Sequence, residues 1–333
     1  MAQPPAKPGL DRMPWYEKYR PTKLDDLVSH DNIVKSMRRY IKSRRMPNMI
    51  FYGPPGAGKT STILSMAQEV YTAKHVSAFV LELNASEERG IETIRQRVHP
   101  FAATKSLHGD MKKIIILDEA DGMTKDAQNA LKRMIEKYSR NVSFCILCNH
   151  LSSIISAIQS RCVRFRFAPL SLEKIRPRLE YIIETEKVNV TNEGIEALFD
   201  VCEGDMRRAL NVLQSATLIY DVVDEEAIYK AVAQPTPAHI RDIFKVLLND
   251  TLADCCRKLQ AECVSKSIAV VDIIKRLHDA VFELDMPPQV HIEILMALAD
   301  VEKRLSIGGS EKVQLAGLCA AFMQARHLIA LHA

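Results

Sequence analysis

The stretch Gly53-Pro54-Pro55-Gly56-Ala57-Gly58-Lys59-Thr60 follows directly after the apolar run Met49-Ile50-Phe51-Tyr52 and decides the fold class. It matches the phosphate-binding pattern G-x-x-x-x-G-K-[ST]. Because glycine has no Cβ, its backbone can curl around a polyphosphate and point N–H groups at it. In this pattern Lys59 reaches the phosphates and Thr60 gives its hydroxyl to Mg²⁺, while a helix expected to begin at Ser61 points its positive end at the phosphates.

The neighbours of this loop argue against a glycine-rich turn that matches by chance. The apolar run before it is typical of a buried strand. After it, Ile63, Leu64, Ala67 and Val70 fall on one face of the helix expected over residues 61–71. A strand, a glycine loop and a helix are the context in which this pattern binds phosphate.

A second run, Ile114-Ile115-Ile116-Leu117-Asp118-Glu119-Ala120-Asp121, joins four apolar residues to three carboxylates. The apolar part predicts a central parallel strand that is buried on both faces and carries acids to the carboxyl edge of a sheet. A core strand with an acidic solvated end would look the same in isolation. Downstream of a phosphate loop, the run instead predicts Asp118 in the Mg²⁺ shell and Glu119 orienting the attacking water.

Strand and helix patterns alternate around these two motifs. We expect further strands at Phe79–Leu83 and Val142–Cys148, an edge strand over Gln159–Phe167, and helices at 31–42, 126–138 and 152–158. This alternation predicts a doubly wound parallel α/β sheet. Asn149 ends the strand beside the acidic one, where its side chain could reach a phosphate or a water, or could serve only as a turn residue.

Composition sets limits on the kind of protein. The chain has 333 residues, 47% of them hydrophobic and 26% charged, and a formal net charge of +4. The length predicts roughly two or three domains. So small a net charge does not by itself indicate nucleic-acid binding, and no apolar run reaches the ~18 residues that cross a membrane. With no leader segment visible, we expect a cytosolic or nuclear protein.

The eight cysteines show no framework of paired spacings. Cys145 and Cys148 form a C-x-x-C, but it lies inside a strand-like run without a second pair or a histidine set. Buried reduced thiols are therefore favoured over zinc or redox use.

Beyond Pro169 the pattern changes from alternating to helical. We expect a disordered start over residues 1–12, an ATP-binding domain over 13–169, a helical lid over 170–233 and a helical domain over 234–333. The last domain carries no chemistry of its own, which favours subunit association, although a monomeric cap would have the same pattern.

Within the lid, Asp205 predicts an N-cap and places Arg207 in the first helical turn. A cation there opposes the helix dipole, which indicates either an external anion or a solvated arginine. Near the start of the chain, the aromatic segment 14–21 could close over an adenine or could only brace the core.

These motifs together resemble AAA+ ATPases of the clamp-loader group, over nearly the whole chain. The resemblance narrows to the small subunits of eukaryotic replication factor C on motifs in the same order and spacing: Trp15–Pro21, Gly53–Thr60, Asn84-Ala85-Ser86, Asp118–Asp121, Asn149, Ser160-Arg161-Cys162 and Gly204–Arg207. Tyr16 departs from the family pattern, since a small aliphatic residue is usual there.

The resemblance implies an ATP- and Mg²⁺-dependent machine of five related subunits that opens the PCNA sliding clamp and places it on primer-template DNA in the nucleus. It implies that Asn149 is sensor 1 and Arg207 is sensor 2, and that Arg161 is an arginine finger that completes a neighbour's site. By the same resemblance the nucleotide base lies against Tyr16, Arg20 and Val28.

For DNA, the resemblance points to Arg89, Arg95 and Lys125, near the starts of two helices that track phosphates without reading sequence. Ordinary solvated helix faces would present the same residues. Two other functions stay open from the residues: a different AAA+ remodeller, and a nucleotide-holding structural subunit with little hydrolysis. The presence of Lys59, Glu119 and Arg161 argues against full loss of hydrolysis.

Overall fold

The structure is a computed structural model that describes residues 13–28, 30–71, 76–86, 92, 94–104, 112–284 and 286–332. It separates into two compact units. The first runs to Val190 and resumes over Leu198–Asp221, and the second contains Thr191–Ala197 and continues from Val222. The predicted division into three domains is a finer one and stays a prediction.

The first unit is built on a five-stranded parallel sheet in the order β2-β3-β4-β1-β5. Its strands are β1 (Met49–Tyr52), β2 (Val80–Asn84), β3 (Lys113–Asp118), β4 (Val142–Cys148) and β5 (Val163–Arg166). The strand order reverses beside β1, which confirms the predicted doubly wound fold. Because all the strands are parallel, their carboxyl ends meet at one edge of the sheet.

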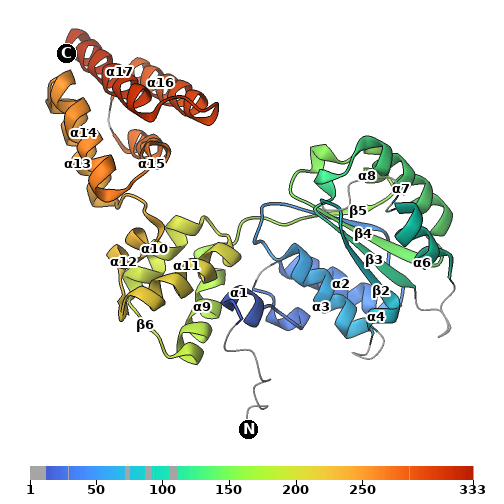
Figure 1. Cartoon of the computed structure of the whole chain (residues 1–333). Coiled ribbons are helices and arrows are strands. Elements are labelled where there is room, and N and C mark those ends of the chain that lie inside the picture. The colour runs from blue at the N-terminus through green and yellow to red at the C-terminus, as the bar shows by residue number, and fades with distance from the viewer. Residues whose placement is uncertain are drawn as a thin grey trace. The chain divides into compact units, whose positions relative to one another are not determined.

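The central strand β3 shows why the sheet needs helices on both faces. Ile114 and Ile116 belong to the core on one face, whereas Ile115 and Leu117 belong to the core on the other. The first core is covered by α2 (Asp31–Ser43) and α3 (Lys59–Val70). The second is covered by helices on the opposite side of the sheet in Figure 1, namely α6 (His99–Ala103), α7 (Lys125–Tyr138) and α8 (Ser156–Gln159).

Further helices, turns and a short strand complete the first unit. They are α1 (Trp15–Lys18), 3₁₀ turns at Leu24–Asp26, Ala120–Gly122 and Leu151–Ser153, α4 (Val76–Phe79), a π-helical turn at Ile94–Val98, α9 (Leu172–Glu186), β6 (Asn189–Val190) and α11 (Met206–Ile219). Helix α10 (Asn192–Cys202) contributes residues to both units.

The helix predicted at 152–158 is wrong in detail, because the chain breaks into a 3₁₀ turn and α8. At the break the side-chain amide of Gln159 donates to Leu151 O at 3.1 Å, which also accepts from Ile154 N, and to Ile154 O at 2.7 Å. The edge strand is also shorter than predicted, since Gln159 ends α8. The helical pattern expected beyond Pro169 missed the two-residue strands β6 and β7 (Val222–Val223). Two residues are too few to show a strand period.

The second unit is helical and has a core of its own. Its helices are α12 (Glu225–Val232), α13 (Pro237–Asn249), α14 (Leu252–Lys266), α15 (Val270–Glu283), α16 (Pro288–Ser306) and α17 (Glu311–His332). None of the helices in the described ranges combines the length and the apolar character that a membrane span needs.

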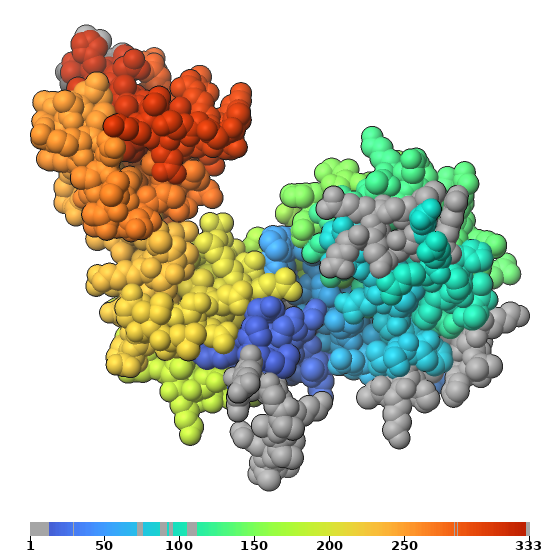
Figure 2. Space-filling view, in the orientation of Figure 1, coloured from blue at the N-terminus to red at the C-terminus, as the bar shows by residue number. Residues whose placement is uncertain are grey.

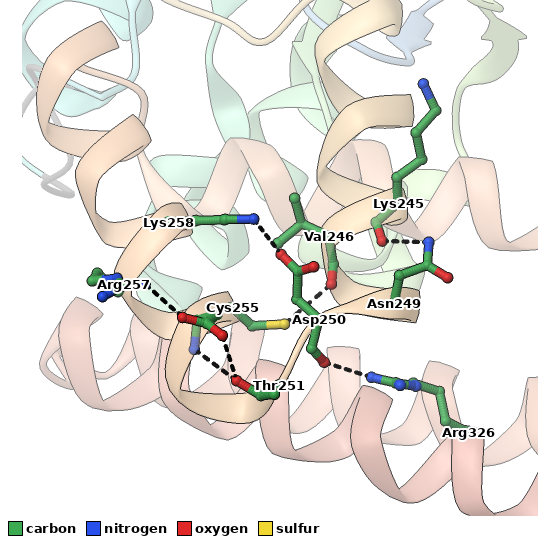
Figure 3. A network of polar contacts seen from close by, with 10 residues as sticks. Lys245, Val246, Asn249, Asp250, Thr251, Cys255, Arg257, Lys258 and Arg326 are labelled. Atoms are coloured by element: carbon green, nitrogen blue, oxygen red, sulfur yellow. Dashed lines mark hydrogen bonds and ion pairs between the residues drawn. The ribbon is translucent and has the colours of Figure 1, made fainter.

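The turn between α13 and α14 is held by a network of polar contacts (Figure 3). Asp250 ends α13, and its carbonyl accepts a hydrogen bond from Arg326 Nη1 of α17 at 2.7 Å. Its carboxylate pairs with Lys258 at 2.6 Å. Thr251 caps α14 by accepting from Asp254 N. Three helices are thus fixed at one point.

Candidate functional site

Most of the predicted site residues surround one cavity of about 240 Å³ at the carboxyl edge of the sheet. The loop after β1, the end of β3 and the residue after β4 all reach it. The predicted residues that line it are Tyr16, Arg20, Val28, Pro55, Gly56, Ala57, Gly58, Lys59, Thr60, Ser61, Asp118, Glu119, Asn149 and Arg207.

The glycine loop closes tightly because two of its glycines cannot carry a side chain. A Cβ on Gly53 would lie 2.0 Å from Phe167 O, and one on Gly56 would lie 1.7 Å from Asp205 Oδ1. Gly56 also has a φ of +67°, in the left-handed region. The loop therefore lies directly against the N-cap residue of α11.

Lys59 lies in the first turn of α3 and is buried, with 8% of its surface exposed. Its ammonium donates to Gly53 O at 2.6 Å, to Pro54 O at 2.9 Å and to Asn149 Oδ1 at 2.9 Å. Burial lowers the pKa of Lys59, and the nearby Asp118 carboxylate opposes that shift. The cation is thus held at the cavity by three weak acceptors, all of which a phosphate group could replace.

Thr60 and Asp118 meet at the same point. The Thr60 hydroxyl donates to Asp118 Oδ2 at 2.9 Å, and Asp118 Oδ1 accepts from Glu119 N at 2.8 Å. A hydroxyl and a carboxylate are hard oxygen donors of the kind that bind Mg²⁺, often through water. The donor set therefore fits a magnesium ion beside a phosphate chain.

Glu119 and Asn149 follow the two neighbouring strands β3 and β4. Glu119 is exposed and has a φ of +52°, a conformation that few residues other than glycine adopt. Asn149 N donates to Asp121 Oδ2 at 3.3 Å, and its side chain accepts from Lys59. Asn149 thus contacts Lys59 of the phosphate-binding loop and is not only a turn residue.

The N-terminal segment both lines the cavity and braces the unit. Tyr16, Arg20 and Val28 face the cavity. Trp15 is buried and its N donates to Gln214 Oε1 of α11 at 3.0 Å. Tyr19 is also buried, and its hydroxyl donates to Glu186 of α9. The two interpretations of this segment therefore do not exclude each other.

Arg207 begins α11 next to the capping residue. Asp205 accepts from Arg207 N at 2.8 Å and from Arg208 N at 3.1 Å, which confirms the predicted N-cap. The Arg207 guanidinium lies over the ring of Tyr16, with its carbon 5.4 Å from the ring centroid. The side chain also lines the cavity.

Arg161 does not line the cavity of its own chain. It follows α8, where Nη1 donates to Ala157 O at 2.6 Å and Nη2 pairs with Glu136 of α7 at 2.6 Å. Its side chain is 37% exposed. An exposed guanidinium that does not line this cavity fits a role outside it.

The three residues predicted for DNA are only partly described. Arg89 lies outside the described residues, as does the side chain of Arg95. Lys125 is exposed at the start of α7, directly after the N-cap Thr124.

The C-x-x-C pair does not form a site. Cys145 belongs to the core on one face of the sheet and Cys148 to the core on the other, because residues three apart in a strand point to opposite faces. The described cysteines are free thiols, and burial raises the pKa of Cys148 to about 12. No cluster of three metal-binding side chains occurs within the described ranges.

Sequence reasoning missed several residues that line the cavity, among them His30 and Arg178. His30 has a φ of +71°, its ring lies edge-on to Phe167 at 4.8 Å, and its buried Nε2 has no hydrogen-bond partner among the described residues. Burial lowers the pKa of His30. Arg178 Nη2 donates to Tyr19 O at 3.0 Å. The position of His30 directly before a predicted helix was the one local signal available.

Three protein family models match parts of the chain, and one of them, "Rad17 P-loop domain", matches residues 10–79. The family described as "ATPase family associated with various cellular activities (AAA)" matches residues 49–170, and "Replication factor C C-terminal domain" matches residues 235–321. Among solved structures, a RuvB Holliday junction branch migration motor of Thermotoga maritima has a TM-score of 0.54 at 15% identity, over 81% of this chain and 93% of that one. That likeness supports the fold.

Relatives match over nearly the full length. Probable replication factor C subunit 5 of Caenorhabditis elegans is 49% identical, over 95% of this chain and 88% of the relative. Replication factor C subunit 5 of Homo sapiens is 46% identical, over 99% of this chain and 97% of the relative. Replication factor C subunit 3 of Schizosaccharomyces pombe is 44% identical, over 92% of this chain and 90% of the relative. The names agree with the motifs, which are most like those of the subunit called third in fungi and fifth in vertebrates. This chain belongs to the replication factor C small-subunit family of AAA+ ATPases.

Proposed function

We propose that this chain binds and hydrolyses ATP as one subunit of the pentameric replication factor C clamp loader, which opens PCNA and places it on primer-template DNA in the nucleus. The observation that carries the proposal is the meeting of Lys59, Thr60, Asp118, Asn149 and Arg207 at one cavity. A chain whose full-length relatives are replication factor C subunits has here every group that a phosphate-binding site needs.

Each group at the cavity has a role that its position supports. The loop N–H groups and Lys59 hold the phosphates, with Lys59 exchanging its three present acceptors for phosphate oxygens. Thr60 and Asp118 hold Mg²⁺ directly or through water. When bound, the ion neutralises charge on the phosphate oxygens.

Hydrolysis requires that a water be aimed at the terminal phosphate. Glu119 accepts the water's proton or orients it, and Asn149 fixes the geometry beside it. Glu119 is exposed at the cavity wall, so it can reach a water that enters with the nucleotide. Arg207 contacts the terminal phosphate from the α11 side. The base lies against Tyr16, Arg20 and Val28.

Arg161 acts on the ATP of a neighbouring subunit. Its planar guanidinium can stabilise charge that grows in the transition state. It is exposed and is held by Glu136 in this chain, so it would exchange that carboxylate for the partner's phosphate on assembly. The association of such neighbours falls to the helical unit that contains the replication factor C C-terminal match. Lys125, together with Arg89 and Arg95, contacts DNA phosphates, which makes binding salt-sensitive and independent of sequence.

The test is the steady-state ATPase rate of this chain assembled with the other replication factor C subunits, with and without PCNA and primed DNA. We expect strong stimulation by clamp and DNA together, and Glu119→Gln in this chain should remove a large part of it. Stimulation that survives Glu119→Gln would move this chain to a nucleotide-holding role. No stimulation with any partner set would favour a different AAA+ activity.

A second variant tests the action in trans. Arg161→Ala should slow hydrolysis in the assembly while leaving ATP binding by the isolated chain unchanged. Loss of that binding to the extent caused by Lys59→Ala would contradict the assignment.

A further inference from the structure

Arg207 differs from the other cations of the site in what holds it. Lys59 is held by two backbone carbonyls and an amide, and Arg161 by the Glu136 carboxylate. The Arg207 guanidinium lies instead on the ring of Tyr16, 5.4 Å from the centroid. Within the part of the chain that the structure describes, no carboxylate forms an ion pair with it.

The backbone that carries Tyr16 is held against α11. The preceding residue, Trp15, is buried and its N donates to Gln214 Oε1 of α11 at 3.0 Å. Gln214 follows Arg207 by about two helical turns, on the same face of α11. Helix α1 therefore lies along α11, as Figure 2 shows where the dark blue N-terminal segment meets yellow atoms of this region, and Tyr16 stays beside Arg207.

A ring orients a guanidinium in a way that a carboxylate cannot. The face of the ring attracts the cation, but it carries no net charge and accepts none of the in-plane N–H groups. The donors at the edge of the guanidinium stay available to a phosphate. A carboxylate would occupy two of those donors and would repel the same phosphate.

We propose that Tyr16 is a positioning residue that holds Arg207 toward the terminal phosphate, and so sets the preference of this chain for ATP over ADP. The inference rests on the proposed function, in which the cavity takes a nucleoside triphosphate. This role of Tyr16 differs from a simple contact with the base, because a ring that touched only the base would affect the affinities for ATP and ADP equally.

The experiment measures the Kd of the full chain for ATPγS and for ADP, with Mg²⁺, by calorimetry. Tyr16→Leu removes the ring face and should weaken ATPγS binding about 2- to 5-fold, the range expected for an exposed cation–π pair. Its ADP affinity should fall by less than its ATPγS affinity, because ADP shares the base contact with Tyr16 but lacks the terminal phosphate that Arg207 meets. Tyr16→Phe keeps the ring and should match the parent for both nucleotides.

A double variant separates positioning from other effects. If Tyr16 acts through Arg207, then Tyr16→Leu should have no further effect on ATPγS binding in an Arg207→Ala background. Arg207→Lys leaves α1 untouched and removes the planar group, so it should show the same ATPγS-specific loss even if Tyr16→Leu does not fold.

Three results would overturn the inference: equal losses for ATPγS and ADP in Tyr16→Leu, no loss for either, or an ATPγS-specific loss that persists at full size without Arg207. A parent chain that binds neither nucleotide would instead overturn the proposed function, and the inference with it.

Discussion

Lys59→Met should separate the binding role of Lys59 from its role in folding. The substitution removes the buried ammonium and its three hydrogen bonds but keeps a side chain of similar length. Burial already lowers the pKa of Lys59, so holding the charged form in this position costs free energy. Without nucleotide, we therefore expect the free energy of unfolding to change by no more than about 1 kcal/mol.

The effect on ATP should be much larger. A hydrogen bond to a charged group contributes about 1.5–3 kcal/mol, which predicts a Kd weakened about 10- to 150-fold. At an ATP concentration of about 100 times the parent's Kd, binding adds about 2.7 kcal/mol to the free energy of unfolding. In Lys59→Met this gain should fall to between about 0.3 and 1.4 kcal/mol.

The assay is chemical denaturation of parent and variant with and without Mg²⁺ and ATP. Lys42→Met is the matched control, because Lys42 is exposed on α2 and does not line the cavity. Its gain from ATP should equal that of the parent. The same gain in Lys59→Met would refute the contact between Lys59 and phosphate.

Three further predictions concern stability. In chemical denaturation, Gly56→Ala should destabilise the chain by about 1–2 kcal/mol more than Gly58→Ala. Both glycines have a positive φ, but only a Cβ on Gly56 would meet the N-cap side chain of α11. Equal losses of stability in the two variants would contradict this close approach. Burial opposes ionisation of Glu186, but hydrogen bonds from Lys18 and Tyr19 outweigh burial and lower the pKa of Glu186 below 4.5. Glu186→Gln should therefore be less stable than the parent at pH 7, and this difference in stability should shrink as the pH falls through the folded-state pKa. A difference that stays constant down to pH 3 would refute the linkage. Arg326→Met should lower the free energy of unfolding by about 1–3 kcal/mol, because it leaves the carbonyl of Asp250 without its charged donor. Arg257→Met removes only an exposed ion pair and should change the free energy of unfolding by less than about 0.5 kcal/mol. Similar losses in both variants would contradict the role of the network.

The fold was predictable because its signals are local. The glycine loop, the apolar strand that ends at Asp118 and the N-cap Asp205 each depend on a few consecutive residues, and the structure has them where they were expected. Periodicity is strong for a strand such as β3 that is buried on both faces. It fails where elements are only two or three residues long, as in β6 and β7.

The contacts that tune the site could not be predicted in the same way. The pair of Arg161 with Glu136 and the stacking of Arg207 on Tyr16 join segments that are distant in sequence, and only the folded chain brings them together. The positive φ of Glu119 has no local cue, because the preceding strand ends in an ordinary aspartate. His30 faces the cavity for a reason that depends on Phe167, far along the chain.

Retention of labelled PCNA on primed circular DNA tests the central claim most directly. Replication factor C would be assembled with and without this chain, incubated with the clamp, the DNA and ATP, and the DNA-bound clamp would be counted after gel filtration. The account predicts retention that requires both ATP and this chain, and that falls when the chain carries Lys59→Met. Clamp retention at the same level in assemblies that lack this chain would contradict it.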